Sequence, residues 1–473
     1  MKDEHQVKDE MDRLHVTPPG SPRLHYHPRK SIGYFGSATT LDLPPEKPIA
    51  VEYSPPDGGW GWVVMIGMFF MQIMAASNAM CFGVLYMELL DYFRESHATT
   101  AWIGSLNVTC FSFTGFFTAI LTNKFGHRWT IIGGSLIATV GFLSAGFCST
   151  VYQLYFTYGI ITGCGVGIAW TAALIGLGRY FSKRRGIAFG VALSGAGVGM
   201  ISYPMLIEYL VQIYSWQGTL FIISGLWFNM CIVGALYRPL NIVKPKSNKK
   251  VDFQSLAEAS LFKEWTFYTL SFAEICWTMA VFIYVYNIPD YTRNLGHSKE
   301  KASQLVLIMG STLIPARLIT GYIAQKNVNH IFCMATLVLI MSLVVGTCFL
   351  SKSYVFIAIY IACQGWLQGA IVVFIPLICT DLFGIERMGH AFSYIHVTDM
   401  VSTLAGPVLT GYIKDKTGSY VYAFILGGCC ALLSSVCLFM IYLKICRDSR
   451  KNKTPQFEVQ EEATKPVIDL PQP

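Results

Sequence analysis

Long apolar runs separated by short polar connections make up most of the chain. Each run holds at least about 20 residues, the length that lets a helix cross the roughly 30 Å hydrocarbon core of a bilayer. The pattern therefore predicts membrane-spanning helices. The twelve predicted spans lie at 60–87, 100–121, 129–148, 152–176, 186–210, 215–237, 265–289, 303–324, 328–350, 354–379, 388–412 and 421–444.

The longest internal break in this pattern is basic and divides the twelve spans into six and six. Two six-helix halves joined by a basic cytoplasmic linker are the organisation of major facilitator transporters. The predicted fold class is an all-α membrane protein with twelve transmembrane helices in two six-helix halves. The expected segments are a disordered cytoplasmic N-terminal tail (1–56), an N-terminal half (57–237), a cytoplasmic linker (238–264), a C-terminal half (265–444) and a cytoplasmic C-terminal tail (445–473).

Lysine and arginine are unevenly divided between the two sets of connections. Cytoplasmic loops of membrane proteins carry more of these residues than external loops do. With both termini inside, the inner connections hold fourteen of them and the outer connections seven. The sequence therefore predicts a multi-pass protein with both termini cytoplasmic.

The composition agrees with a membrane protein and disfavours other classes. The chain is 53% hydrophobic and 13% charged, which is unlike a soluble globular protein. Its net charge of +7 lies in connections and tails without a basic–aromatic module, so we expect lipid headgroups and no nucleic acid as partners. The 14 cysteines lie in or beside spans, and no HExxH, GxSxG or Walker motif occurs. We expect no enzyme activity, no cofactor and no metal site.

The polar N-terminal tail ends abruptly where the first span begins. An acidic residue at such a boundary favours a helix N-terminus, and tryptophans favour the headgroup level. The boundary reads Asp57-Gly58-Gly59-Trp60-Gly61-Trp62. This string closely resembles the N-terminal signature of the monocarboxylate transporter family of the major facilitator superfamily.

Two cytoplasmic connections add to the resemblance. Between spans 4 and 5, Tyr180 and Phe181 precede a basic cluster with Arg184 and Arg185, and an Ala- and Gly-spaced helix start follows. This stretch resembles the second signature of the family. After span 2, residues 123–128 resemble a degenerate form of the superfamily's loop motif, with asparagine where aspartate is usual. We expect that loop to hold inter-helix geometry.

The resemblance implies a plasma-membrane secondary transporter that moves a small organic solute, a monocarboxylate or a related compound, by alternating access. Family members often travel to the plasma membrane with a single-pass immunoglobulin-type glycoprotein. The resemblance therefore implies such an ancillary partner, although no residue of this chain indicates it.

Glycines at four-residue spacing predict close helix packing, because small residues on one face let backbones approach. Span 4 carries Gly159, Gly163 and Gly167, and span 5 carries Gly195 and Gly199. We expect these faces to be structural.

Ionisable residues inside the spans gather in the C-terminal half. Glu274 lies in span 7, Arg317 in span 8 and Asp399 in span 11, with His396 three residues earlier on the same helical face. Such groups are costly in a bilayer unless they pair or face an aqueous cavity. At 1.5 Å per residue, the arginine and the two acids lie roughly 10, 13 and 16 Å from the cytoplasmic ends, so they could meet. We expect these four residues to bind solute, with a structural ion pair or a snorkelling arginine as the alternative.

The sequence departs from the proton-linked members of the family at two positions. The resemblance places a span 1 lysine where Met80 stands, and an aspartate where Leu313 stands, four residues before Arg317. Transport is therefore predicted not to be proton-coupled. With an arginine opposed by two acids, a zwitterion such as an amino acid, creatine or carnitine is an alternative solute. A membrane receptor that does not transport is a second alternative.

Overall fold

The structure is a computed structural model that describes residues 56–80, 82–239, 259–326, 328–350 and 352–463. Every regular element in these ranges is helical. Most of the predicted N-terminal tail, much of the linker and the last ten residues lie outside the described ranges. The disorder predicted for the N-terminal tail is therefore a prediction about residues that the structure does not describe.

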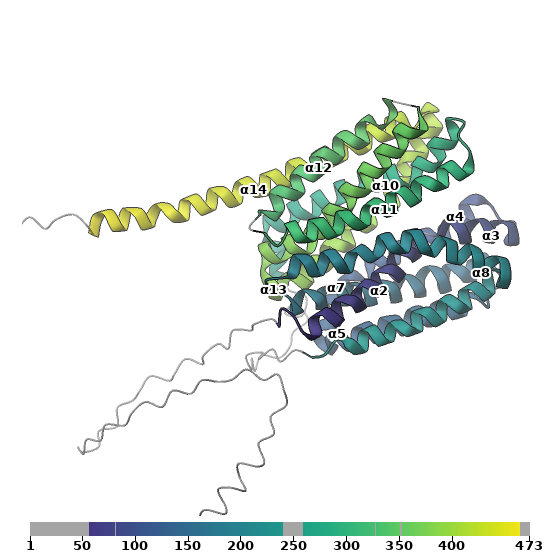
Figure 1. The fold of residues 1–473 in the computed structure, drawn as a ribbon, viewed down its shortest axis with the longest axis horizontal. Coiled ribbons are helices and arrows are strands. Elements are labelled where there is room, and N and C mark those ends of the chain that lie inside the picture. Colours follow the sequence, from purple (N-terminus) through teal and green to yellow (C-terminus); the bar gives the residue numbers. More distant parts are fainter. Residues whose placement is uncertain (1–55, 81, 240–258, 327, 351, 464–473) are drawn as a thin grey trace, which may run out of the picture. The chain divides into compact units, whose positions relative to one another are not determined.

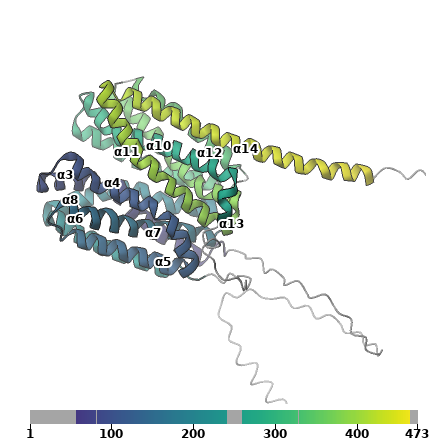
Figure 2. The same ribbon diagram turned by 180° about the vertical axis from the view of Figure 1, so that it is seen from behind.

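Helices of the two predicted halves form two neighbouring bundles (Figures 1 and 2). The N-terminal bundle contains α2 (Trp60–Met80), α3 (Phe82–Phe93), α4 (His97–Phe113), α5 (Gly115–Ala145), α6 (Val151–Leu154), the π-helix η1 (Tyr155–Thr162), α7 (Gly163–Tyr180) and α8 (Arg185–Leu236). The C-terminal bundle contains η2 (Ala259–Lys263), α10 (Trp265–Asn294), α11 (Lys299–Ile323), α12 (His330–Thr347), η3 (Cys348–Leu350), α13 (Tyr354–Thr417) and α14 (Val421–Ala463).

Eight of the described helical stretches are long and apolar enough to cross a membrane. Three of them contain one residue with positive φ, where the chain leaves the helical conformation: Gly126 in α5, Ser215 in α8 and Gly384 in α13. The breaks at Gly126 and Gly384 fall in connections that the sequence predicted between spans, and the break at Ser215 falls on the first residue of the predicted span 215–237. The described residues of all twelve predicted runs are almost entirely helical, and α2 and α3 account for those of the first run. Helix α14 continues past the predicted end of the last span at residue 444.

Glycine packing agrees with the prediction for span 4. A Cβ added at Gly159 would lie 3.0 Å from Leu106 Cβ, and one added at Gly163 would lie 2.5 Å from the Asn107 carbonyl oxygen. Gly167 similarly faces the carbonyl of Phe111. This glycine face therefore brings η1 and α7 against α4. On α8, Gly195 packs in the same way on the backbone of Phe69 in α2, and Gly199 is buried.

The two bundles contact each other through α8 with α11, and through α4, α5 and α7 with α13. Between α8 and α11 the contact is made by backbones, because Gly190 and Gly321 face each other without side chains. Between α5 and α13, Asn123 Nδ2 lies 2.6 Å from His390 Nε2. The asparagine of the predicted loop motif thus joins the two halves.

Candidate functional site

The two predicted signatures contact each other. Asp57 Oδ1 accepts hydrogen bonds from the backbone N–H of Ser182 at 2.6 Å and of Arg184 at 3.3 Å. The backbone N–H of Asp57 donates to the carbonyl of Tyr180 at 3.1 Å. A carboxylate that accepts two backbone N–H groups forms charge-assisted bonds. The first signature therefore fastens the start of α2 to the connection between α7 and α8.

Aromatic and basic side chains extend this contact. A Cβ added at Gly61 would lie 3.0 Å from the ring of Phe181, so glycine lets the ring approach α2. The Phe181 ring centroid lies 5.2 Å from that of Trp62, and the Arg184 guanidinium lies 6.0 Å from the Trp62 ring. Arg185 Nε donates to the Phe181 carbonyl at 2.9 Å. The basic cluster thus has a structural role at this connection.

The remaining signature residues shape the helix start. Gly59 has a positive φ of 53°, and the N–H of Gly61 donates to the carbonyl of Gly58 at 3.0 Å. Trp60 Nε1 donates to the carbonyl of Leu236 at 2.7 Å, at the end of α8. The sequence assigned Trp60 and Trp62 to the headgroup level and did not predict these contacts between segments far apart in the chain.

Replacing Asp57 by alanine should lower the free energy of unfolding by about 1–2 kcal/mol, because two backbone donors lose a charged acceptor. Asp57→Asn keeps an acceptor oxygen and should lose less. Thermal unfolding of the purified variants measures the difference. Equal midpoints for Asp57→Ala and the wild type would show that the contact adds nothing to stability.

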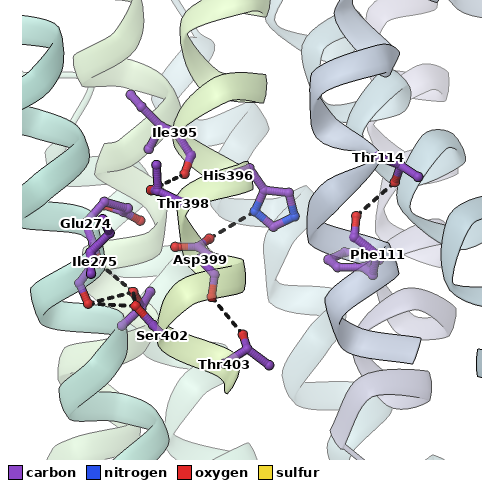
Figure 3. A network of polar contacts seen from close by, with 11 residues as sticks. Phe111, Thr114, Glu274, Ile275, Ile395, His396, Thr398, Asp399, Ser402 and Thr403 are labelled. Atoms are coloured by element: carbon purple, nitrogen blue, oxygen red, sulfur yellow. Dashed lines mark hydrogen bonds and ion pairs between the residues drawn. The ribbon is translucent and has the colours of Figure 1, made fainter. Parts of the chain in front are cut away.

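Two of the predicted intramembrane groups form a pair on α13. His396 Nδ1 lies 3.0 Å from Asp399 Oδ2, as the three-residue spacing predicted (Figure 3). Glu274 on α10 lies on the side of Asp399 opposite His396, and its side chain is 3% exposed. Among the described residues, neither Asp399 Oδ1 nor Glu274 Oε2 has a hydrogen-bond partner. The site therefore holds two buried acceptor atoms that are unused.

Hydroxyl groups hold α10 and α13 together beside these acids. Thr278 Oγ1 donates to Ser402 Oγ at 3.0 Å, and Ser402 Oγ donates to the carbonyl of Ile275 at 2.8 Å. Thr403 Oγ1 on the next turn donates to the carbonyl of Asp399 at 2.9 Å. Because these bonds fix the two helices, both carboxylates are positioned by rigid elements.

Arg317 lies on α11, is 5% exposed and turns toward the other half. Its Nη1 donates to the carbonyl of Leu193 on α8. Among the described residues, no acid lies within 4.0 Å of its guanidinium, and its Nε has no partner. The expectation that the arginine and the two acids meet is therefore wrong for this structure. The reason is the backbone contact at Gly190 and Gly321, which brings the Leu193 carbonyl within reach of the guanidinium.

Three aromatic side chains that the sequence did not single out surround His396. The ring centroids of Phe111 on α4 and Trp170 on α7 each lie 5.2 Å from the imidazole centroid. The ring of Phe392, one turn earlier on α13, is nearly parallel to the imidazole at 6.1 Å and lies 6.2 Å from the Trp170 ring. Figure 3 shows His396 projecting from α13 toward α4 and Phe111. Aromatic residues are 14% of this chain, and nothing in the local pattern distinguishes these three.

The two positions at which proton-linked relatives carry charge are apolar here. Met80 is the last residue of α2, and its side chain lies outside the described part of the structure. Leu313 is 2% exposed on α11, one turn before Arg317. Neither side chain can bind a proton.

The chemistry of the site divides between the halves. The C-terminal half supplies a buried guanidinium and two carboxylates, and the N-terminal half supplies aromatic surface and a backbone carbonyl. A guanidinium presents several donors in one plane and suits a carboxylate. Among the described residues, no group of three or more His, Cys, Asp or Glu side chains could hold a metal ion.

Comparison with known proteins gives concordant results. The family model described as the Major Facilitator Superfamily matches residues 68–351 and 331–470. The chain is 28% identical to monocarboxylate transporter 12 of Homo sapiens, over 81% of each chain. It is 29% identical to monocarboxylate transporter 4 of Mus musculus, over 88% of this chain and 91% of the relative.

Among solved structures, the fucose:proton symporter FucP of E. coli matches with a TM-score of 0.64 at 15% identity, over 80% of this chain and 98% of that one. FucP in the outward conformation matches with a TM-score of 0.63 at 15% identity, over 81% of this chain and 99% of that one.

Proposed function

The chain belongs to the Major Facilitator Superfamily, within it to the monocarboxylate transporter family, and on that premise we propose that it carries a small carboxylate-bearing solute without proton coupling. As a multi-pass membrane protein of this family it is a secondary transporter of small organic solutes and not an enzyme. The solute, the coupling and the roles of individual residues are the proposal.

One observation carries the choice of a carboxylate. The guanidinium of Arg317 is buried between the halves, and among the described residues no acid neutralises it within 4.0 Å. A buried cation without a counter-charge is costly. A carboxylate of the solute would supply that charge and could bond through Nε, which is unused. Binding would thus favour a state in which both halves close around the solute.

The absence of proton coupling rests on Met80 and Leu313. These residues stand where the resemblance places a lysine and an aspartate, and neither can exchange a proton. Proton coupling would have to run through other groups, of which His396 and Asp399 are the pair in direct contact.

A zwitterionic solute is the second candidate. Asp399 Oδ1 and Glu274 Oε2 are buried acceptors without partners among the described residues. An ammonium or guanidinium group on the solute could donate to either one, while its carboxylate meets Arg317. Amino acids, creatine and carnitine have both kinds of group.

Uptake into liposomes that contain only the purified protein tests transport itself. A panel of monocarboxylates, amino acids, creatine and carnitine should include at least one solute that accumulates in protein-containing vesicles and not in protein-free ones. Saturable binding of a panel solute without flux would instead support a receptor.

We place the protein in the plasma membrane with both termini cytoplasmic, on the Lys and Arg distribution and the family relation. A single-pass immunoglobulin-type glycoprotein is a candidate ancillary partner. An epitope inserted after residue 450 should bind antibody only after the cells are permeabilised. Antibody labelling of intact cells would show that the C-terminal tail is extracellular and that the predicted orientation is wrong.

A further inference from the structure

A groove on the outer surface of the N-terminal bundle lies between α2 and the second part of α8. Its lining includes Ile66, Gly67 and Phe70 of α2, and Asn229, Val233 and Leu236 of α8. The α2 residues follow the spacing of one helical face, and the stretch 63–70 spans about 10 Å. We call it the α2–α8 groove.

Gly67 creates this groove. A Cβ added there would lie 3.2 Å from Val233 Cγ1 and 3.3 Å from Leu236 Cδ1, so the backbone of α2 lies almost against α8. The side chains of Ile66 and Phe70, which share this face of α2 and line the groove, are 51% and 52% exposed. Apart from Asn229, the lining residues are apolar, so within the hydrocarbon core the groove suits an acyl chain.

A cation lies at one end of the α2–α8 groove. The Arg238 guanidinium lies 3.6 Å from the ring centroid of Trp60, whose Nε1 bonds to the Leu236 carbonyl. Arg238 is exposed, and no acid of the described residues forms an ion pair with it. Trp60 therefore holds a positive charge within two residues of the groove lining.

We propose that the α2–α8 groove binds one anionic phospholipid, with an acyl chain along Gly67 and the headgroup phosphate on Arg238. Charge complementarity favours this occupant over a zwitterionic lipid, whose own cation offsets its phosphate. This end of the groove is the predicted cytoplasmic end, where membranes carry anionic lipids. A partner's transmembrane helix would bring basic flanking residues to the same face, and these would repel Arg238.

Native mass spectrometry of the detergent-solubilised full chain tests this proposal, with dioleoyl-phosphatidylglycerol and dioleoyl-phosphatidylcholine as the probes. The wild type should retain one phosphatidylglycerol in preference to phosphatidylcholine. Arg238→Gln should bind phosphatidylglycerol about fivefold more weakly, the effect of one basic residue at a membrane surface. Arg128→Gln is the matched control, because Arg128 also lies over a tryptophan, at 5.9 Å from Trp129, but does not border the groove.

A second variant tests the acyl chain. Val63 lines the groove, and Val63→Phe should reduce lipid retention while Arg238 remains in place. Millimolar inorganic phosphate should leave the bound lipid unchanged, since a phosphate ion has no chain to bury. Equal phosphatidylglycerol binding by Arg238→Gln and Arg128→Gln would overturn the proposal. So would displacement of the lipid by phosphate, or a Val63→Phe variant that loses a co-purifying single-pass protein and keeps its lipid.

Discussion

Replacing Arg317 by lysine will reduce initial solute uptake by about 10- to 100-fold at limiting solute concentration, with surface abundance near that of the wild type. The guanidinium makes two contacts in the proposed mechanism. Its Nη1 donates to the Leu193 carbonyl, and its Nε, which has no partner among the described residues, donates to the solute. A lysine keeps the charge but lacks the planar fork, so it cannot meet both partners. Loss of a charged hydrogen bond is worth roughly 1.5–3 kcal/mol, which corresponds to that range of rates.

The measurement is initial uptake of the identified solute, normalised to surface protein. Arg128→Lys is the control, since Arg128 is exposed in a connection outside the site. Arg317→Ala should transport even less. It should not disturb the acids, because the structure separates them from the arginine. Near wild-type uptake by Arg317→Lys would make Arg317 a purely structural residue.

Asp399→Asn is expected to separate the two candidate solutes. If the solute is a zwitterion, removal of the negative charge should lower its uptake at least about 30-fold, because its cationic group loses a buried counter-charge. Uptake of a plain monocarboxylate should stay within a few-fold. The asparagine can still accept a bond from His396, so the local geometry should persist.

Competition between a monocarboxylate and its amino-substituted analogue, in wild type and variant, measures this selectivity. Asp415→Asn provides the control, since Asp415 is an exposed acid on the same helix. An equal fall in the uptake of both solutes by Asp399→Asn would show that Asp399 has a structural role. Unchanged uptake of both solutes would show that Asp399 does not take part in solute binding.

The apolar runs predicted the helices well because a bilayer demands continuous apolar segments of one length. The breaks at Gly126 and Gly384 also fell where the sequence predicted connections. The pair His396 and Asp399 could be predicted because it depends only on three-residue spacing within one helix.

Features that depend on helix rotation could not be predicted in this way. Arg317 and Glu274 share a similar depth, but depth does not say which neighbour a side chain faces. Arg317 meets α8 because two glycines there bring the backbones into contact. Likewise, Asp57 bonds to backbone groups of residues more than 120 positions away, and no local pattern marks those acceptor and donor positions.

Uptake under an imposed pH difference shows whether transport depends on protons. Liposomes that contain only the purified chain are loaded with a pH dye and given the identified solute, with outside pH either equal to or one unit below the inside pH. We predict saturable uptake at the same initial rate in both conditions, without solute-dependent acidification inside. Strong acceleration by the inward proton gradient, together with acidification that follows solute entry, would contradict this prediction and show that transport is coupled to protons.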